Sequence, residues 1–442
     1  MPGRSSSAGA RAGAVAGAGT GGRPGRYDVV VVGSGVSGLA CARDLYAAGL
    51  SVRVLEGSDG VGGRMRTDEA GGFLLDRGFQ VFNTSYPQVK RRMRLRDLWL
   101  RPFTPGALLH TERGRLRFSD PTRRPRASAD LLPGRLASGR DLLALGLLTG
   151  RDMLAPARQL KRGPERTTRT ALAEAGISDE LVETLFRPFL AGVFLEDELE
   201  TSSRFFHLVW RSMTRGTQCL PAAGIGAVPA QLADALPPGT VGLESPVREL
   251  TDEGVLLDDG TGLAAHAVVV ATGPAAAARL LPGLHVPPTR TVTTYYHAAS
   301  EPPLREPTLL LDTRRRFLNT CVLSEVAPTY APDSRALIST SVLGADLSGR
   351  EKGVREALAE VYGADTAPWE LLAAYEIPDA LPAMPPPQML SRRTRLGAGR
   401  YVCGDHRATG SVQGALASGA RAARAVLAER AGAGVRPVTG GR

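Results

Sequence analysis

A run of four valines that leads directly into a glycine-rich turn constrains this chain more than any other feature. Val29–Val32 is β-branched throughout, which is typical of a strand buried on both faces of a parallel sheet. Gly33, Gly35 and Gly38 follow at the spacing GxGxxG, and a segment with the apolar periodicity of a helix comes next. A second short strand is expected over 51–55. The pattern predicts a βαβ unit and therefore an α/β fold.

The same turn has the features of a dinucleotide-binding motif. Gly33 permits a tight turn, Gly35 lets the backbone approach a pyrophosphate, and Gly38 allows close packing of helix and strand. The first turn of the helix, at Ser37, presents unpaired N–H groups to phosphate. Glu56 ends the second strand, where an acid can accept hydrogen bonds from an adenosine ribose and disfavour a 2′-phosphate.

A second glycine motif follows Glu56 and favours FAD over NAD. Gly62-Gly63 is followed by Arg64 and Arg66, so that a glycine pair and a guanidinium can meet the same pyrophosphate from the other side. Arginine suits this role because its planar fork grips phosphate oxygens with two hydrogen bonds. A simple NAD dehydrogenase has no need of such a second clamp.

These motifs, with the segment 72–78, resemble the FAD-dependent superfamily of amine oxidases, phytoene desaturases and protoporphyrinogen oxidases. The C-terminal segment 401–419 resembles the second flavin signature of that superfamily. The resemblance implies that Asp405 bonds the ribitol hydroxyls, that the helix after it points its N-terminus at the flavin, and that the strand at Pro246-Val247 contacts adenine. The residues expected to bind the cofactor are Gly33, Gly35, Ser37, Gly38, Glu56, Gly63, Arg64, Arg66, Gly78, Val247, Gly404, Asp405 and Val412.

Within the superfamily, the segments 187–194, 224–229 and 380–382 look more like the desaturase and protoporphyrinogen oxidase branch. Amine oxidases of the superfamily usually place a lysine near flavin N5 on a substrate-domain strand, and the segment 291–327 contains none. The flavin is expected to be non-covalent, because no cysteine lies between Cys321 and Cys403.

The resemblance implies oxidation or desaturation of a hydrophobic small molecule by hydride transfer to flavin N5, with oxygen or a quinone as electron acceptor. No Ser/His/Asp set and no HExxH motif is present, and no catalytic base is assigned. Gln80, Tyr296 and His406 are expected to line the pocket. Three alternatives stay open: an amine oxidase that releases hydrogen peroxide, a redox-neutral isomerase of the carotene type, and a non-catalytic flavin-binding protein.

The expected architecture is a Rossmann-like FAD-binding domain of the glutathione reductase type with a discontinuous α+β substrate domain. The strands after the first βαβ unit mostly lack helical crossovers, which indicates a mainly antiparallel second sheet. The expected boundaries are a disordered tail at 1–26, an FAD-binding domain at 27–85, 220–290 and 390–432, a substrate domain at 86–219 (helical and basic) and 291–389, and a flexible tail at 433–442.

Charge is concentrated in one part of the 442-residue chain, whose net charge is +10. Residues 86–170 hold 20 Lys/Arg against 7 Asp/Glu. Arginines interleaved with Trp and Leu there suit an anionic membrane surface, and a solvated charged face is the alternative. No nucleic-acid recognition module accompanies this charge.

The remaining composition excludes several classes of protein. No apolar run reaches the roughly 18 residues of a spanning helix, so an integral membrane protein is not expected. The four cysteines are far apart, which indicates neither a disulfide scaffold nor a zinc site, and no metal is expected. The N-terminus lacks the pattern of a secretory signal. The expected location is the cytoplasm, with peripheral attachment to the inner face of the membrane as an option.

Overall fold

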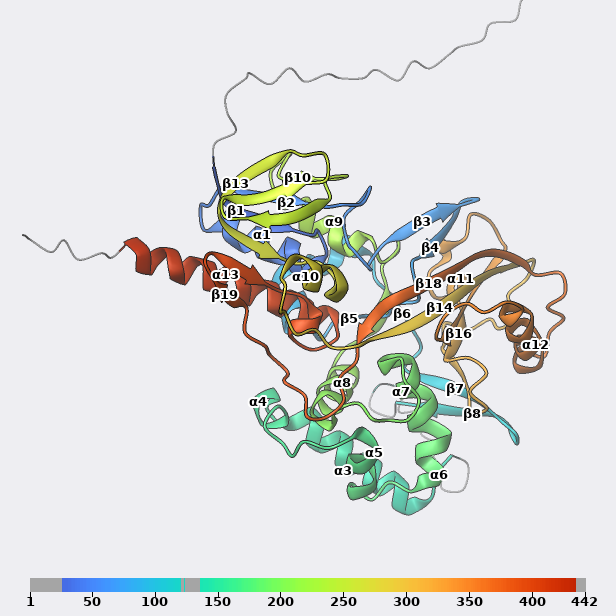
Figure 1. Cartoon of the computed structure of the whole chain (residues 1–442). Coiled ribbons are helices and arrows are strands. Elements are labelled where there is room, and N and C mark those ends of the chain that lie inside the picture. The colour runs from blue at the N-terminus through green and yellow to red at the C-terminus, as the bar shows by residue number, and fades with distance from the viewer. Residues whose placement is uncertain (1–25, 121–122, 124–135, 435–442) are drawn as a thin grey trace, which may run out of the picture.

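The computed structural model describes residues 26–120, 123 and 136–434, and its two largest sheets lie in different parts of the molecule (Figure 1). The expected tail at 1–26 lies outside the described residues except for Arg26. Most of the expected tail at 433–442 also lies outside them, and residues 433 and 434 belong to the last helix.

An eight-stranded sheet is built around the predicted first strand, β1 (Tyr27–Val32). β1 pairs in parallel with β2 (Val52–Leu55) and with β13 (Gly262–Val270), which confirms the predicted βαβ unit. The parallel strands run in the order β10-β2-β1-β13-β20. The other members of this sheet are β10 (Val241–Gly242), β11 (Val247–Thr251), β12 (Gly254–Leu257), β19 (Arg395–Gly397) and β20 (Arg400–Val402).

The valines of β1 are buried because both faces of the sheet are covered. Val29 and Val31 belong to one hydrophobic cluster, whereas Val30 and Val32 belong to another on the opposite face. The first cluster includes residues of α1 (Val36–Ala47), which is the crossover helix between β1 and β2. Side chains on alternate faces of β1 therefore fill two separate cores.

A seven-stranded sheet forms the second unit and runs β18-β14-β17-β16-β15-β7-β8. All neighbouring strands are antiparallel except β15 and β7, so the expected mainly antiparallel sheet is confirmed. Its strands are β7 (Gly106–Thr111), β8 (Gly114–Ser119), β14 (Thr289–Ala299), β15 (Leu310–Asp312), β16 (Asn319–Val322), β17 (Ala336–Leu343) and β18 (Glu370–Pro382).

One expectation for the segment 86–219 is wrong, because this segment is not helical throughout. β7 and β8 form a hairpin at the edge of the seven-stranded sheet. The side chains of β7 alternate between two hydrophobic clusters, as those of a strand do. Ala107 and Leu109 pack into one cluster, and Leu108 packs into another. Further short strands in this region are β5 (Phe82–Asn83), β6 (Arg101–Pro102) and β9 (Gln218–Leu220), which form a three-stranded sheet.

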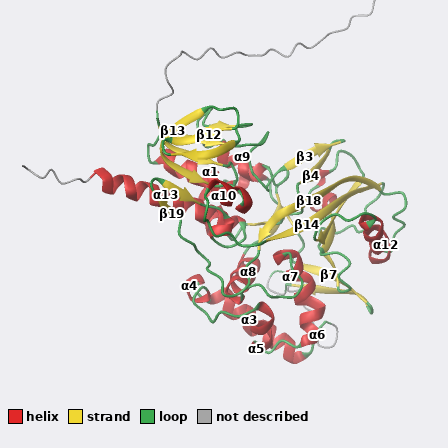
Figure 2. Ribbon diagram, viewed as in Figure 1, coloured by secondary structure: helices red, strands yellow, loops and turns green. Residues whose placement is uncertain are grey.

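The helices between residues 139 and 215 gather below the two larger sheets (Figure 2). A π-helical turn at Val182–Phe186 separates the helix at Asp179–Leu181 from the helix at Arg187–Phe194. Pro188, which follows that turn, lacks the N–H that a regular helix needs. The helices are α2 (Pro87–Arg92), α3 (Gly139–Leu154), α4 (Ala157–Leu160), α5 (Thr168–Glu174), α6 (Asp179–Leu181), α7 (Arg187–Phe194), α8 (Ser203–Arg215), α9 (Ala227–Ala233), α10 (Pro274–Leu280), α11 (Leu323–Val326), α12 (Arg350–Tyr362) and α13 (Val412–Gly434). Among the helices of the described ranges, none is long and apolar enough to cross a bilayer.

A buried carboxylate links distant segments at the end of β4 (Phe73–Asp76), which pairs with β3 (Thr67–Ala70). Asp76 accepts hydrogen bonds from the Thr67 hydroxyl at 2.6 Å, the Ile225 N–H at 2.9 Å and the Tyr330 hydroxyl at 2.9 Å. Burial outweighs these bonds and raises the pKa of Asp76 to about 6.

We expect Asp76→Asn to change how stability depends on pH. Because the folded pKa of Asp76 is raised from 3.8 to about 6, ionisation destabilises the folded state as the pH rises through this window. The stability of the variant relative to wild type should therefore rise by about 2 kcal/mol between pH 4 and pH 7. Denaturant unfolding at both pH values measures this difference. Glu253→Gln, at an exposed position, is the control, and parallel curves for Asp76→Asn and wild type would contradict the assignment.

Candidate functional site

The three glycines of the first turn have the three different environments that the motif predicts. Gly33 has φ +101°, and a Cβ at that position would lie 3.1 Å from the Ala271 carbonyl oxygen. A Cβ on Gly38 would lie 2.0 Å from the Gly33 carbonyl oxygen, which no side chain tolerates. A Cβ added at Gly35 would have no atom within 4 Å. The turn therefore keeps its backbone open at Gly35, where the N-terminus of α1 begins.

The first turn of α1 also carries an unused polar group. Ser37 is 4% exposed, and its hydroxyl has no hydrogen-bond partner in the described part of the chain. A buried hydroxyl without a partner is costly unless a ligand supplies one. With the unpaired N–H groups of the helix N-terminus, this group fits an oxyanion at the turn.

Glu56 occupies the predicted place at the end of β2. One of its carboxylate oxygens accepts from the Ser34 N–H at 2.8 Å and from the Ser34 hydroxyl at 2.7 Å. The other oxygen accepts from the N–H and the hydroxyl of Ser58. The Ser245 N–H bonds the Glu56 carbonyl at 2.7 Å, which brings the start of β11, at buried Val247, beside this acid. The two residues expected at the adenosine end are thus neighbours.

The second glycine pair lies against the first turn, as expected for a clamp on a shared ligand. The Gly62 N–H donates to the Ser34 carbonyl at 3.0 Å. Gly63 has φ +61°, and a Cβ there would lie 3.5 Å from the Cα of Gly35. Two backbone segments without side chains therefore lie directly against each other.

Arg64 joins the N-terminal and C-terminal motifs. Its guanidinium lies 2.6 Å from the Asp405 carboxylate and donates to the Ala380 carbonyl at 2.6 Å. The Gln80 side chain donates to the Arg64 carbonyl at 2.7 Å. Arg66 takes a different partner, Asp59 at 2.6 Å, and thereby holds its own loop together.

The C-terminal motif presents a buried, neutral histidine. His406 is 2% exposed, and neither ring nitrogen has a hydrogen-bond partner in the described part of the chain. Burial lowers the pKa of His406 to about 4, so the ring is neutral at pH 7. Gly404 has φ +146°, and a Cβ there would meet the His406 ring at 2.5 Å. Asp405, at 6% exposed, is followed by α13, whose first residue is Val412.

Two other predicted residues lie at the edge of this arrangement. Gly78 has φ +84°, and a Cβ there would lie 3.4 Å from the Ile377 side chain of β18. Tyr296 is fully buried rather than facing an accessible cavity. Its hydroxyl donates to the Asp76 carbonyl at 2.7 Å, and its ring packs edge-on against Tyr375. Packing and this hydrogen bond explain why Tyr296 belongs to the core.

Sequence reasoning missed the contribution of β18. The Ala380 carbonyl binds Arg64, and Ile377 lies beside Gly78, so this strand borders the site. A backbone carbonyl leaves no trace in the residue type, so the sequence did not indicate that Ala380 contacts Arg64. The segment 380–382 was visible in the sequence only as a resemblance.

A model of the flavin-containing amine oxidoreductase family matches residues 36–427. The chain belongs to this family. It is a flavin-dependent oxidoreductase, and the predicted FAD cofactor and superfamily are thereby confirmed. The mixed α/β fold is that of the family's structures.

Curated relatives match this chain over short stretches. Putrescine oxidase from Kocuria rosea is 53% identical over 53 residues, which are 12% of this chain and 11% of the relative. Protoporphyrinogen oxidase 2 from Arabidopsis thaliana is 43% identical over 61 residues, 14% of this chain and 12% of the relative. The matches span about a tenth of the length of these relatives.

Solved structures share the fold over nearly the whole flavoprotein. Cyclohexylamine oxidase from Brevibacterium oxydans IH-35A has a TM-score of 0.69 at 20% identity, covering 92% of this chain and 100% of that one. An oxidoreductase from Methanosarcina mazei has a TM-score of 0.69 at 19% identity, covering 89% and 99%. At this identity the likeness establishes the fold alone.

The residues of the site fit FAD. The open backbone at Gly35 and Gly63 leaves room for a pyrophosphate, and the unpartnered Ser37 hydroxyl and His406 nitrogens are polar groups that a bound cofactor can satisfy.

We expect Gly35→Ala to lower FAD affinity without lowering the stability of the cofactor-free protein. The φ of Gly35 is −62°, which alanine adopts freely, and the new methyl would meet no protein atom. It would occupy the space through which a pyrophosphate reaches the backbone. Fluorescence titration of the apoprotein with FAD, together with thermal unfolding, measures both properties.

Two further variants serve as comparisons for Gly35→Ala. Gly139→Ala, at another position with open space, should change neither property. Gly38→Ala should destabilise the protein, since its Cβ would overlap the Gly33 carbonyl. Unchanged FAD affinity in Gly35→Ala would contradict the placement of the pyrophosphate.

Proposed function

We propose that the protein oxidises or desaturates a hydrophobic small molecule by hydride transfer to N5 of a non-covalent FAD, with oxygen or a quinone as electron acceptor. The flavin supplies the hydride acceptor, and the chain supplies binding and orientation. In this proposal, the parallel sheet around β1 is a Rossmann-like FAD-binding domain of the glutathione reductase type. The seven-stranded sheet, with the helices below it, is the substrate domain.

The observation that carries this proposal is the convergence at Arg64. One guanidinium holds the C-terminal motif through Asp405 and the substrate-domain sheet through the Ala380 carbonyl of β18. Next to this contact lies a small apolar cluster that includes Val292, Leu318 and Ile377. A cofactor that lies across the two glycine motifs would therefore end beside apolar side chains, as a hydrophobic substrate requires.

The cofactor would run along the line of predicted residues. Glu56 and Val247 would hold the adenosine end, and the backbone at Gly35 and Gly63 would hold the pyrophosphate. Asp405 and the N-terminus of α13 would hold the ribitol and flavin end. His406, which is neutral and unpartnered, can donate one hydrogen bond and accept another there.

The distribution of lysine supports the desaturase and protoporphyrinogen oxidase branch over an amine oxidase. Lys90, Lys161 and Lys352 are the three lysines of the chain, and all three are exposed. None therefore lies in the buried site at Arg64. An amine oxidase, a redox-neutral isomerase and a non-catalytic flavin-binding protein remain the alternatives to be separated by experiment.

We expect the purified protein to show flavin absorbance bands that move to the supernatant on acid precipitation and run as FAD. Under anaerobic conditions, the flavin should be bleached by an apolar dehydrogenation substrate and recover its colour with oxygen or a quinone. Hydrogen peroxide release on a panel of amines would favour the amine oxidase. Turnover that requires reduced flavin but consumes no electrons would favour the isomerase. A flavin that no donor reduces would favour the non-catalytic alternative.

We further propose that α3 docks on an anionic membrane surface. Leu143, Leu147 and Leu154 are 66%, 67% and 79% exposed, and their spacing places them along one side of the helix. Arg140 and Arg151 are exposed on the same helix. An apolar stripe with flanking arginines is suited to the boundary between headgroups and acyl chains.

Only part of the basic segment is available for such docking. Arg92 is 6% exposed and pairs with Asp44 of α1 at 2.6 Å, so its charge is used inside the protein. Its removal would test packing rather than membrane binding. The exposed leucines of α3 are therefore better targets.

We expect the double variant Leu143→Ser, Leu147→Ser to bind vesicles of phosphatidylcholine and phosphatidylglycerol about tenfold more weakly than wild type, because each exposed leucine would bury in the interface. Sedimentation with the vesicles measures the bound fraction. Leu347→Ser, at a loop position that is 66% exposed, is the matched control. Equal sedimentation of all three proteins would contradict docking through α3 and would favour the alternative, in which the arginines form a solvated charged face.

A further inference from the structure

A small cavity with an unusual excess of arginine lies between α7 and the turn that follows β15. Its volume is about 60 Å³, which accommodates a group of carboxylate size. Four arginines line it, at positions 187, 315, 316 and 350, against two aspartates, Asp197 and Asp312. Arginines therefore outnumber aspartates in the lining, and three glutamates outside it, Glu183, Glu198 and Glu360, pair with these arginines.

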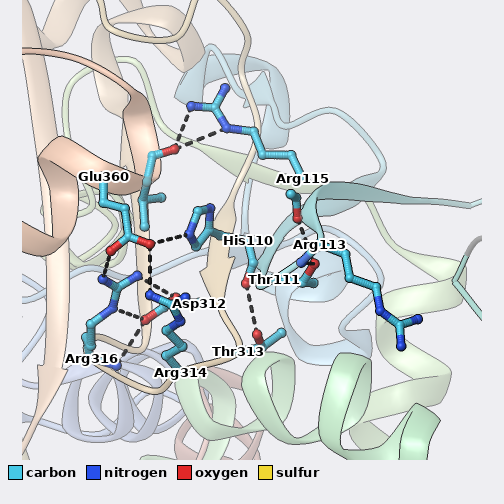
Figure 3. Close-up of polar contacts among 11 residues, drawn as sticks. His110, Thr111, Arg113, Arg115, Asp312, Thr313, Arg314, Arg316 and Glu360 are labelled. Carbon is cyan, nitrogen blue, oxygen red and sulfur yellow. Dashed lines mark hydrogen bonds and ion pairs between the residues drawn. The ribbon is translucent and has the colours of Figure 1, made fainter.

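Arg316 is the arginine whose charge is already matched. It binds Asp312 with two hydrogen bonds, at 2.8 and 3.0 Å, and also contacts Glu360. Figure 3 shows Glu360 between Arg316 and His110, with Arg314 on the same carboxylate. This network holds one wall of the cavity in place. The partners of the other three lining arginines are described next.

Arg350 is held through carbonyl groups, whereas Arg187 is held through one carbonyl group and two carboxylates. Arg350 donates to the carbonyls of Leu343 and Ala345, so these bonds fix the guanidinium without cancelling its charge. Arg187 donates to the Asp197 carbonyl at 2.7 Å and forms ion pairs with Glu183 and Glu198. Both side chains are thus positioned before any ligand arrives.

Arg315 is the arginine with the weakest contacts. Its ion pairs with Asp197 and Glu198 are 3.6 and 3.8 Å long, and its side chain is 49% exposed. Its φ is +61°, a left-handed conformation that costs energy in a residue with a Cβ. Residues with a strained backbone of this kind concentrate at ligand sites, and Arg315 lines the cavity.

The cavity shares lining residues with the apolar cluster beside the proposed flavin site. Ala191, Leu318 and Leu343 line the cavity and also belong to that cluster. Ile377 and Ala380 complete the cluster on β18, and the Ala380 carbonyl binds Arg64. A path of apolar side chains therefore connects the arginines to the residues at the flavin end.

We propose that this cavity binds the carboxylate of an otherwise apolar substrate, whose hydrocarbon part lies over the cluster toward the flavin. This inference rests on the proposed function and assigns the substrate class of the same site. Guanidinium groups pair with carboxylates through charge-assisted, bidentate hydrogen bonds. The same charges repel a protonated amine, so the site disfavours cationic substrates.

The test uses three ligands with the same ten-carbon chain and different end groups: decanoate, decanol and decylamine. Isothermal titration calorimetry on the flavin-loaded protein gives their affinities, and the visible spectrum reports whether the flavin senses them. We expect decanoate to bind about tenfold or more tightly than decylamine and to shift the flavin bands, because one charge-assisted hydrogen bond corresponds to roughly that ratio.

Arg315→Asn removes the charge at a position whose left-handed backbone suits asparagine. This variant should bind decanoate about tenfold more weakly than wild type and should bind decanol with unchanged affinity. Arg314→Asn is the matched control, because this neighbour pairs with Glu360 and does not line the cavity. Both variants should retain the flavin spectrum of the wild type.

Three results would overturn the inference: tighter binding of decylamine than of decanoate, equal effects of the two variants, or decanoate binding that leaves the flavin spectrum unchanged. The comparison of ligands on the wild-type protein decides the matter even if Arg315→Asn does not fold. A protein that holds no flavin would instead contradict the proposed function, and calorimetry would still report on the cavity.

Discussion

The close approach of α1 to the glycine turn and to α13 is the contact on which the rest of the structure depends. A Cβ on Gly38 would lie 2.0 Å from the Gly33 carbonyl, and one on Gly419 would lie 2.1 Å from the Ser37 carbonyl. Both contacts require glycine because backbone meets backbone. They bring the N-terminus of α1 to the end of β1 and bring the C-terminal helix beside it. The cofactor site then forms from segments at opposite ends of the chain.

Long-range polar contacts complete what this packing begins. Arg64 connects the turn after β2 to Asp405 and to β18, and Asp76 connects β4 to Tyr330 and to the Ile225 backbone. Each of these groups is held by partners from several segments of the chain. The position of the apolar cluster relative to the flavin motifs is therefore set by a few hydrogen bonds at the junction of the two sheets.

The arginines of the chain have different roles that their number alone conceals. Arg92 is buried against Asp44, and Arg316 is matched by Asp312 and Glu360, so these charges serve the fold. Arg315 and Arg350 lie at a cavity and are not matched in the same way. A count of charge along the sequence locates a basic region, but only the partners of each guanidinium distinguish a structural ion pair from a binding group.

The sequence by itself determined the βαβ unit and the second glycine motif, and its resemblance to known proteins gave the flavin family. The two motifs follow from local backbone preferences: β-branched residues in β1, glycine where φ is positive or a helix packs closely, and helical periodicity in α1. Only the tertiary structure decided that β7 and β8 join the second sheet, that Tyr296 is buried, and that arginines distant in sequence share one cavity. Such features depend on which side chains meet across long stretches of chain, and no local preference specifies those partners.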